Sequence, residues 1–176
     1  MGCSIGPMAP ARGSTWGTPR AMNGQYKEPL PSEAVMEATF DLKRFHDAQA
    51  PVYAQALKEL RAGRKSSHWM WFIFPQLRGL GRSDTAQFYG ISGSAEAVAY
   101  LADPVLGARL RECCNALLGH TGKRAETIFG ELDALKLHSS LTLFSRTSSG
   151  DPLFAAVLER YFNGEEDPKT LELLVS

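Results

Sequence analysis

Apolar residues recur at helical spacing along most of the chain after its first forty residues. Between residues 53 and 60 the apolar positions fall on one helical face, and Gly63 follows where such a helix would end. Similar apolar stripes run through residues 106–117 and 154–162. This spacing predicts a series of amphipathic helices that bury one face each.

Helix start signals accompany these stripes. An Asp-Pro pair stands before three predicted helices, at residues 103–104, 151–152 and 167–168. The aspartate can accept hydrogen bonds from the first free N–H groups of a helix, and proline fits the first turn because its missing N–H is not needed there. Pro51 stands in the same way before the helix predicted over 53–60. Both signals favour helices.

Two apolar segments are ambiguous. Residues 69–74 form a continuous apolar run that fits either a buried strand or a buried helix, and Ser66 and Ser67 just ahead of it favour a capped helix. Residues 137–144 alternate partly like a strand, but their apolar positions also fit one helical face. A strand here would need a partner, and no second convincing strand exists. The sequence therefore predicts an all-α, single-domain bundle of six to nine helices.

The first part of the chain has a different character. Residues 1–38 are rich in Gly, Pro, Ser and Thr and show no apolar period. Such a segment cannot bury enough apolar surface to offset the entropy lost on ordering. We expect a disordered N-terminal extension over 1–38 and one helical domain over 39–176. Met36 leaves open whether the extension is a real flexible segment or a mis-assigned upstream start.

Composition narrows the classes of partner. Nineteen basic and nineteen acidic side chains balance, so no net field attracts nucleic acid or an anionic membrane. No apolar run approaches the roughly 18 residues of a membrane span. The first ten residues lack the basic and apolar regions of a secretory signal. Three cysteines make a poor disulfide framework, which favours the reducing cytoplasm.

Metal and nucleophile motifs are weak. The four histidines include no pair four residues apart, and no Cys-x-x-Cys occurs, so we expect no metal and no cofactor. Ser140 beside Lys136 superficially resembles a Ser-Lys nucleophilic pair, but no oxyanion-hole motif accompanies it. Whether the chain is an enzyme stays open.

Three segments carry polar or basic groups beside apolar bulk. Residues 64–76 join basic side chains to two tryptophans and a histidine, which suits a planar ring bearing phosphate or carboxylate. A Gly-Arg loop follows at 76–84, and its glycines let the backbone approach a ligand closely. Asp133, Lys136 and Ser140 share one helical face. Each segment also has an ordinary structural interpretation, as aromatic core, capped turn or solvated face.

If these segments converge, they satisfy one another's polar groups around one anion-accepting pocket. The candidate ligand-binding residues are His68, Trp69, Trp71, Gln76, Arg82, Tyr89, Lys136 and Ser140. We interpret them as a site for a small anionic, nucleotide-like ligand, with or without its hydrolysis. Small helical N-glycosidases that act on ADP-ribose derivatives support this by analogy only. The alternative is a non-enzymatic protein-interaction module with an exposed aromatic patch, whose partner the sequence does not identify.

Longer strings in the chain resemble one bacterial family whose members are small domains of unknown function. The strings are DLKRFHDAQAPVY, RKSSHWMWFIFPQLRGLGRS, AEAVAYLADPVLGARLREC and IFGELDALKLHSSLTLF. The resemblance runs from about Asp41 to Leu174. It implies a mainly α-helical fold and assigns no reaction and no catalytic residues. Members are often mislabelled as calpastatin, although calpain inhibitors of that kind are long, disordered and repetitive.

Overall fold

The structure, a computed structural model, describes residues 40–175, and the extension expected over 1–38 lies outside them. Within the described residues the chain forms ten helices and no named strand, which confirms the all-α fold class. The helices are α1 (Lys43–Gln49), α2 (Tyr53–Ala62), α3 (Met70–Ile73), α4 (Asp84–Phe88), α5 (Ser94–Ala102), α6 (Leu106–Leu118), α7 (Ala125–Phe129), α8 (Glu131–Thr147), α9 (Pro152–Phe162) and α10 (Pro168–Leu174). Ten exceeds the predicted six to nine, and three of the ten, α3, α4 and α7, have only four or five residues.

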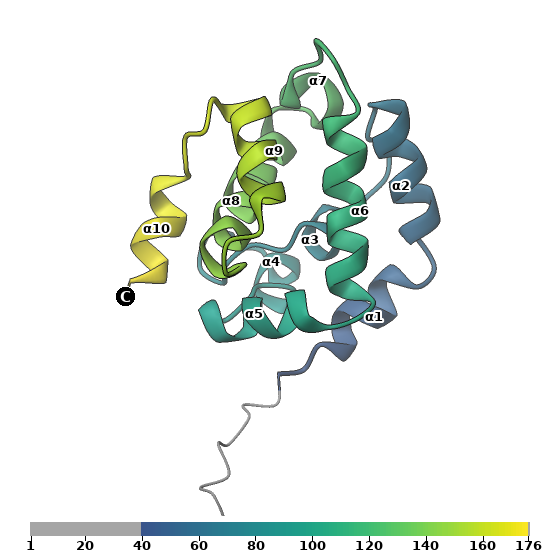
Figure 1. The fold of residues 1–176 in the computed structure, drawn as a ribbon. Coiled ribbons are helices and arrows are strands. Elements are labelled where there is room, and N and C mark those ends of the chain that lie inside the picture. Colours follow the sequence, from purple (N-terminus) through teal and green to yellow (C-terminus); the bar gives the residue numbers. More distant parts are fainter. Residues whose placement is uncertain (1–39, 176) are drawn as a thin grey trace, which may run out of the picture. The chain divides into compact units, whose positions relative to one another are not determined.

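Helix α8 is central to the packing. It has 17 residues, the most of any described helix, and it packs against α5, α7, α9 and α10 (Figure 1). Leu137, Leu141 and Phe144 are buried on it, which confirms the helical interpretation of 137–144. Leu132 and Leu135 on the same helix are 76% and 63% exposed, because they lie on its opposite side. One side of α8 therefore faces the core and another is available to solvent.

The apolar run over 69–74 is helical at four of its six residues, as the sequence favoured. The helical turn is Met70–Ile73, and the two serines ahead of it do not cap it. Instead the backbone N–H groups of Ser66 and Ser67 donate to the carboxylate of Glu59, at 2.9 and 3.1 Å. The indole N–H of Trp69 donates to the same carboxylate at 2.8 Å. A side chain from α2 thus holds the segment ahead of α3, while no side chain caps α3 itself.

The Asp-Pro signals act as predicted in two of three cases. Asp151 and Asp167 cap α9 and α10, each accepting from a backbone N–H of the first turn. Asp103 accepts from two backbone N–H groups, but a turn intervenes and α6 begins only at Leu106. Gly63 ends α2 in the left-handed conformation, with a φ of 66°.

The loop between α3 and α4 is held at both ends. Two backbone hydrogen bonds of 2.8 Å, from Arg78 N to Ile91 O and from Ile91 N to Gln76 O, form an isolated bridge. At the other end, the Oγ of Ser83 accepts from Ala86 N and caps α4. These bonds fix the loop over 76–83, which forms one wall of the pocket described below.

Candidate functional site

A pocket of about 520 Å³ lies between this loop and the solvent-facing side of α8. Trp71 of α3 and Gln76 line one wall, and Lys136 and Ser139 of α8 line another. The start of α10 closes a third side with Asp167 and Lys169. This volume lies within the range of small-molecule sites in proteins.

Lys136 lies against the aromatic wall. Its Nζ is 4.5 Å from the centroid of the Trp71 ring, close enough for a cation–π interaction. Both side chains are partly exposed to the pocket. A positive charge and an aromatic surface therefore meet at one point of the pocket.

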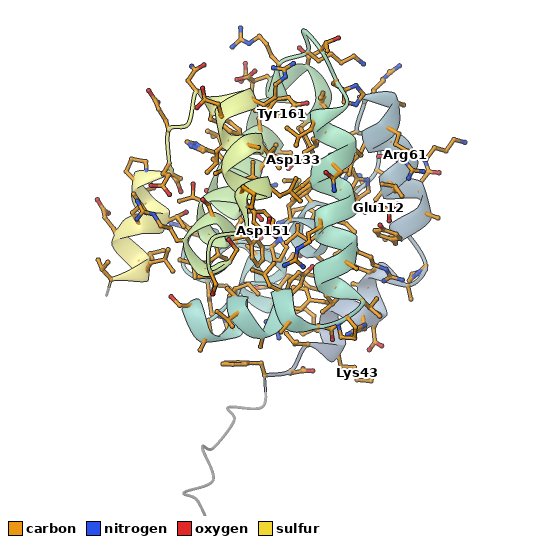
Figure 2. The ribbon with its side chains drawn as sticks, viewed as in Figure 1. Lys43, Arg61, Glu112, Asp133, Asp151 and Tyr161 are labelled. Carbon is orange, nitrogen blue, oxygen red and sulfur yellow. The ribbon has the colours of Figure 1, made fainter. Side chains whose placement is uncertain are left out.

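Asp133 holds two lysines behind this wall. Its Oδ1 is 2.6 Å from Lys136 Nζ and its Oδ2 is 2.6 Å from Lys65 Nζ (Asp133 is labelled in Figure 2). The three side chains are only 9% (Lys65), 18% (Asp133) and 26% (Lys136) exposed. Burial alone would raise the pKa of Asp133, but hydrogen bonds from the two amines outweigh it and lower the pKa. Asp133 is therefore ionised at neutral pH.

This cluster of Lys65, Asp133 and Lys136 has an unbalanced charge. Two ammonium groups share one carboxylate, and no second carboxylate pairs with either amine within residues 40–175. The sum is one positive charge in a region mostly shielded from water. Burying an unpaired charge is costly, so an anion that reaches Lys136 would be stabilised there.

The α10 wall is held by hydrogen bonds. Asp167 Oδ2 accepts from Ser139 Oγ at 2.9 Å and from Thr170 Oγ1 at 2.6 Å. The backbone N–H of Asp167 donates to Thr142 Oγ1 at 2.9 Å. Burial alone would raise the pKa of Asp167, but these hydroxyl groups outweigh it and lower the pKa. Lys169, next along the wall, forms no ion pair within the described part of the chain.

Gln76 has an unused amide. The residue is half-buried and lines both the pocket and a narrow recess of about 10 Å³ beside it. Tyr89 lines the same recess. Within the described residues the side-chain amide of Gln76 makes no hydrogen bond. One donor group and one acceptor oxygen are therefore free at this wall.

Four of the eight predicted site residues come together. Trp71, Gln76 and Lys136 line the pocket, and Tyr89 lines the adjoining recess. They come from α3, the following loop, α8 and the end of α4. The three segments singled out in the sequence do meet around one cavity.

The other four do not reach it. Trp69 is buried in the core with its indole N–H on Glu59, and Ser140 is fully buried, with no partner for its Oγ in the described residues. His68 and Arg82 are exposed and do not line the pocket.

Helical geometry explains part of this. Neighbouring residues on a helix point about 100° apart, so Ser139 faces the pocket and Ser140 does not. Trp69 precedes the single turn of α3 and turns inward, whereas Trp71 within that turn faces the pocket. In the loop, Gly81 and Ser83 face the pocket on either side of Arg82.

Several residues at the site were not predicted, and only some of them lie near a predicted one. Lys65 lies inside the cluster over 64–76 that the sequence did single out, and Asp133 was expected beside Lys136. Asp167 and Lys169 had no such signal, because they approach α8 from about 30 residues further along the chain.

Neither a metal site nor a membrane-spanning helix is found in the described residues. Among residues 40–175 no group of three or more His, Cys, Asp or Glu side chains could hold a metal ion. No helix in that part of the chain is both long and apolar enough to cross a membrane.

Comparison with known proteins confirms the resemblance to a family of unknown function. The profile of a family described as "Protein of unknown function (DUF1810)" matches residues 39–174. The crystal structure of the conserved hypothetical protein Rv1873 from Mycobacterium tuberculosis is similar, with 54% sequence identity and a TM-score of 0.76. The match covers 78% of this chain and 98% of that one. The search of curated proteins found no match to this chain.

Proposed function

The chain belongs to the DUF1810 family, and since that family's description names no activity, we propose that its pocket binds a small anionic, nucleotide-like ligand. The observation that carries this proposal is the excess positive charge of the Lys65–Asp133–Lys136 cluster. A bound anion beside Lys136 neutralises that charge where water does so poorly. Charge-assisted hydrogen bonds to an ammonium group are also among the stronger ones.

The neighbouring groups favour a ligand with a flat ring. Trp71 offers aromatic surface next to the charge, and Leu80 and Leu135 add apolar wall. On the α10 side Lys169 brings a positive charge and Asp167 a negative one, so the excess positive charge comes from the Lys65–Asp133–Lys136 cluster. A planar ring joined to a phosphate would use both the aromatic and the basic parts of the pocket.

Hydrolysis is not part of the proposal. The hydroxyl of Ser139 and the carboxylate of Asp167 bond to each other and fix the start of α10. The Nε2 of His138 lies 2.8 Å from the carbonyl oxygen of Glu165, so it too has a structural partner. These groups account for the geometry of the wall without a reaction.

Calorimetric titration with adenosine 5′-monophosphate (AMP) tests the binding. Replacing Lys136 by methionine keeps the apolar stem against Trp71 and removes the charge, so we expect affinity to fall about tenfold or more. Lys58→Met is the matched control, because Lys58 is exposed on α2 and has no ion pair in the described residues. Equal affinity in the two variants would contradict the proposal.

Lys65→Met tests the charge argument separately. Lys65 does not line the pocket, but its removal leaves Lys136 and Asp133 as a neutral pair. We expect weaker AMP binding than in the unaltered protein and stronger than in Lys136→Met. Unchanged binding would show that the cluster's excess charge does not attract the ligand.

A protein-interaction module is the second candidate. Phe88, Leu132 and Leu135 are 57%, 76% and 63% exposed, so they offer apolar side chains to a partner. The aromatic patch expected from the tryptophans is not exposed, because Trp69 is buried and Trp71 is half-buried beside Lys136. Such a module predicts no rise in melting temperature with small anions, whereas a ligand of the native state raises it.

A further inference from the structure

We infer that Gln76 recognises the hydrogen-bonding edge of a nucleobase, so that the ligand is a nucleoside phosphate and not a sugar phosphate or an inorganic anion. The inference rests on the proposed function, because it concerns the same pocket. It assigns Gln76 as the residue that determines specificity.

The free amide of Gln76 is exceptional among the glutamines of residues 40–175. Each of the other three donates from its side-chain amide: Gln49 to Phe72 O at 2.7 Å, Gln55 to Glu59 Oε1 at 3.0 Å and Gln87 to Gly81 O at 2.6 Å. Gln55 and Gln87 do so even though they are exposed. The glutamine at the pocket is half-buried and has no such partner. Because this amide is not one of the fully buried polar groups, solvent reaches it in the free protein, and the edge of a ligand can take the place of that water.

The backbone holds Gln76 in place. Its carbonyl oxygen accepts a hydrogen bond from Ile91 N at 2.8 Å. The residue just before it, Pro75, has its φ fixed by its own ring. The side chain therefore extends from a fixed point of the pocket wall. Such preorganisation lowers the entropy cost of binding.

The surroundings of Gln76 suit the edge of a ring. Trp71 and Gln76 both line the pocket and the recess beside it. The recess, about 10 Å³, is the size of a single water-sized group such as an exocyclic nitrogen or oxygen. A ring that lies along Trp71 can thus present its edge to Gln76 with one substituent in the recess.

The chemistry of the amide selects the class of ring. A glutamine side chain offers a donor and an acceptor side by side, and it pairs with a ring edge that has an acceptor beside a donor. Nucleobases have such an edge, whereas ribose phosphates and simple aromatic acids do not. The ligand class that fits Gln76, Trp71 and Lys136 together is therefore a nucleoside phosphate.

The test compares three probes, AMP, ribose 5-phosphate and guanosine 5′-monophosphate (GMP), by calorimetric titration. We expect the unaltered protein to bind AMP about tenfold tighter than ribose 5-phosphate. In Gln76→Met the donor and the acceptor are both lost, so this preference should fall about tenfold while ribose 5-phosphate binds as before. That variant adds no charge to the pocket.

Gln76→Glu gives a change of specificity as the second readout. A carboxylate only accepts hydrogen bonds, so it cannot satisfy the acceptor on the adenine edge. Guanine presents a ring N–H beside an amino group, and two donors suit a carboxylate. We expect the ratio of AMP to GMP affinity to fall about tenfold. Asn115→Asp adds the same charge at an exposed position of α6 and should leave the ratio unchanged.

Two results would overturn the inference while leaving the binding of an anion at Lys136 intact. One is equal affinity of the unaltered protein for AMP and ribose 5-phosphate, with both dependent on Lys136. The other is an equal loss of affinity for AMP and for GMP in Gln76→Glu, because charge repulsion alone would produce that result. If no phosphate compound binds, or if Lys136→Met has no effect, the proposed function itself fails.

Discussion

Glu59 is a buried carboxylate that holds the segment before the pocket. It is 4% exposed and accepts hydrogen bonds from Gln55, Ser66, Ser67 and Trp69. Burial alone would raise its pKa, but these hydrogen bonds outweigh it and hold the pKa well below the usual value of 4.5. The folded state therefore favours the ionised form of Glu59 more than the unfolded chain does.

This shift predicts how stability depends on pH. Because the folded pKa is lowered, the contribution of Glu59 is present above about pH 5 and declines at lower pH, where the unfolded chain takes up a proton that the folded carboxylate does not. Glu59→Gln should lose about 1–3 kcal/mol of unfolding free energy at pH 7 and should differ less from the unaltered protein at pH 3. Urea unfolding at both pH values measures this. Glu131→Gln, at an exposed position, is the control, and an equal deficit at both pH values would contradict the assignment.

Residue positions also show what local sequence can and cannot predict about the site. Trp71 and Gln76 were predictable because they belong to one short cluster of aromatic and polar residues. The choice of Ser140 over Ser139 was wrong for the pocket wall, because one helical position changes the direction of a side chain by about 100°. The sequence pattern did not fix which side of α8 faces the pocket.

Helix α10 is the element that closes the pocket, and a few contacts hold it. It has seven residues and packs mainly on α8. Asp167 both caps it and accepts from Ser139, while Arg146 of α8 pairs with Glu166 just before it. The start of this helix thus determines where Lys169 stands.

Asp167→Ala should loosen α10 and weaken ligand binding. The lost cap costs about 1 kcal/mol, and the link to Ser139 goes with it. Hydrogen exchange of residues 168–174 should become faster, and AMP affinity should fall even though a negative charge is removed from the pocket wall. Asp151→Ala is the control, since Asp151 caps α9 but does not line the pocket. If both variants affect binding equally, the role of α10 in the site is refuted.

At the level of elements, local signals predicted the longer helices well. The Asp-Pro caps of α9 and α10 lie where the sequence placed them, because a cap depends on residues within one turn. The hydrogen bonds just ahead of the short helix α3 were less predictable, since their acceptor is Glu59, ten residues before Trp69. The position of α10 at the pocket depends on contacts between segments far apart in the sequence, which a local sequence pattern cannot predict.

The whole chain has no net charge, so any attraction of an anion must be local. Nineteen basic and nineteen acidic residues balance overall, but the Lys65–Asp133–Lys136 cluster keeps one positive charge in excess. Binding that depends on so few charges should weaken only modestly with salt. This distinguishes it from nucleic-acid binding, which involves many phosphates and falls steeply with salt.

Shortening the chain tests the predicted extension. The buried apolar core of the described residues runs from Phe45 to Leu158. A chain that begins at Met36 keeps all of this core, so its melting temperature should stay within a few degrees of that of the full chain. Thermal unfolding of the two proteins measures this. A large loss of melting temperature would show that residues 1–35 contribute to the folded domain.

The central claim is that an anionic, nucleotide-like ligand binds beside Trp71 and Lys136. The most direct measurement is the NMR signal of the tryptophan indole N–H groups during titration with AMP, because the chain has only three tryptophans and Trp71→Phe identifies the relevant signal. We expect the Trp71 signal to shift and saturate and the signal of buried Trp69 to stay in place, and in Lys136→Met saturation should need about tenfold more AMP or beyond. Saturable AMP binding that leaves the Trp71 signal unchanged would contradict the account.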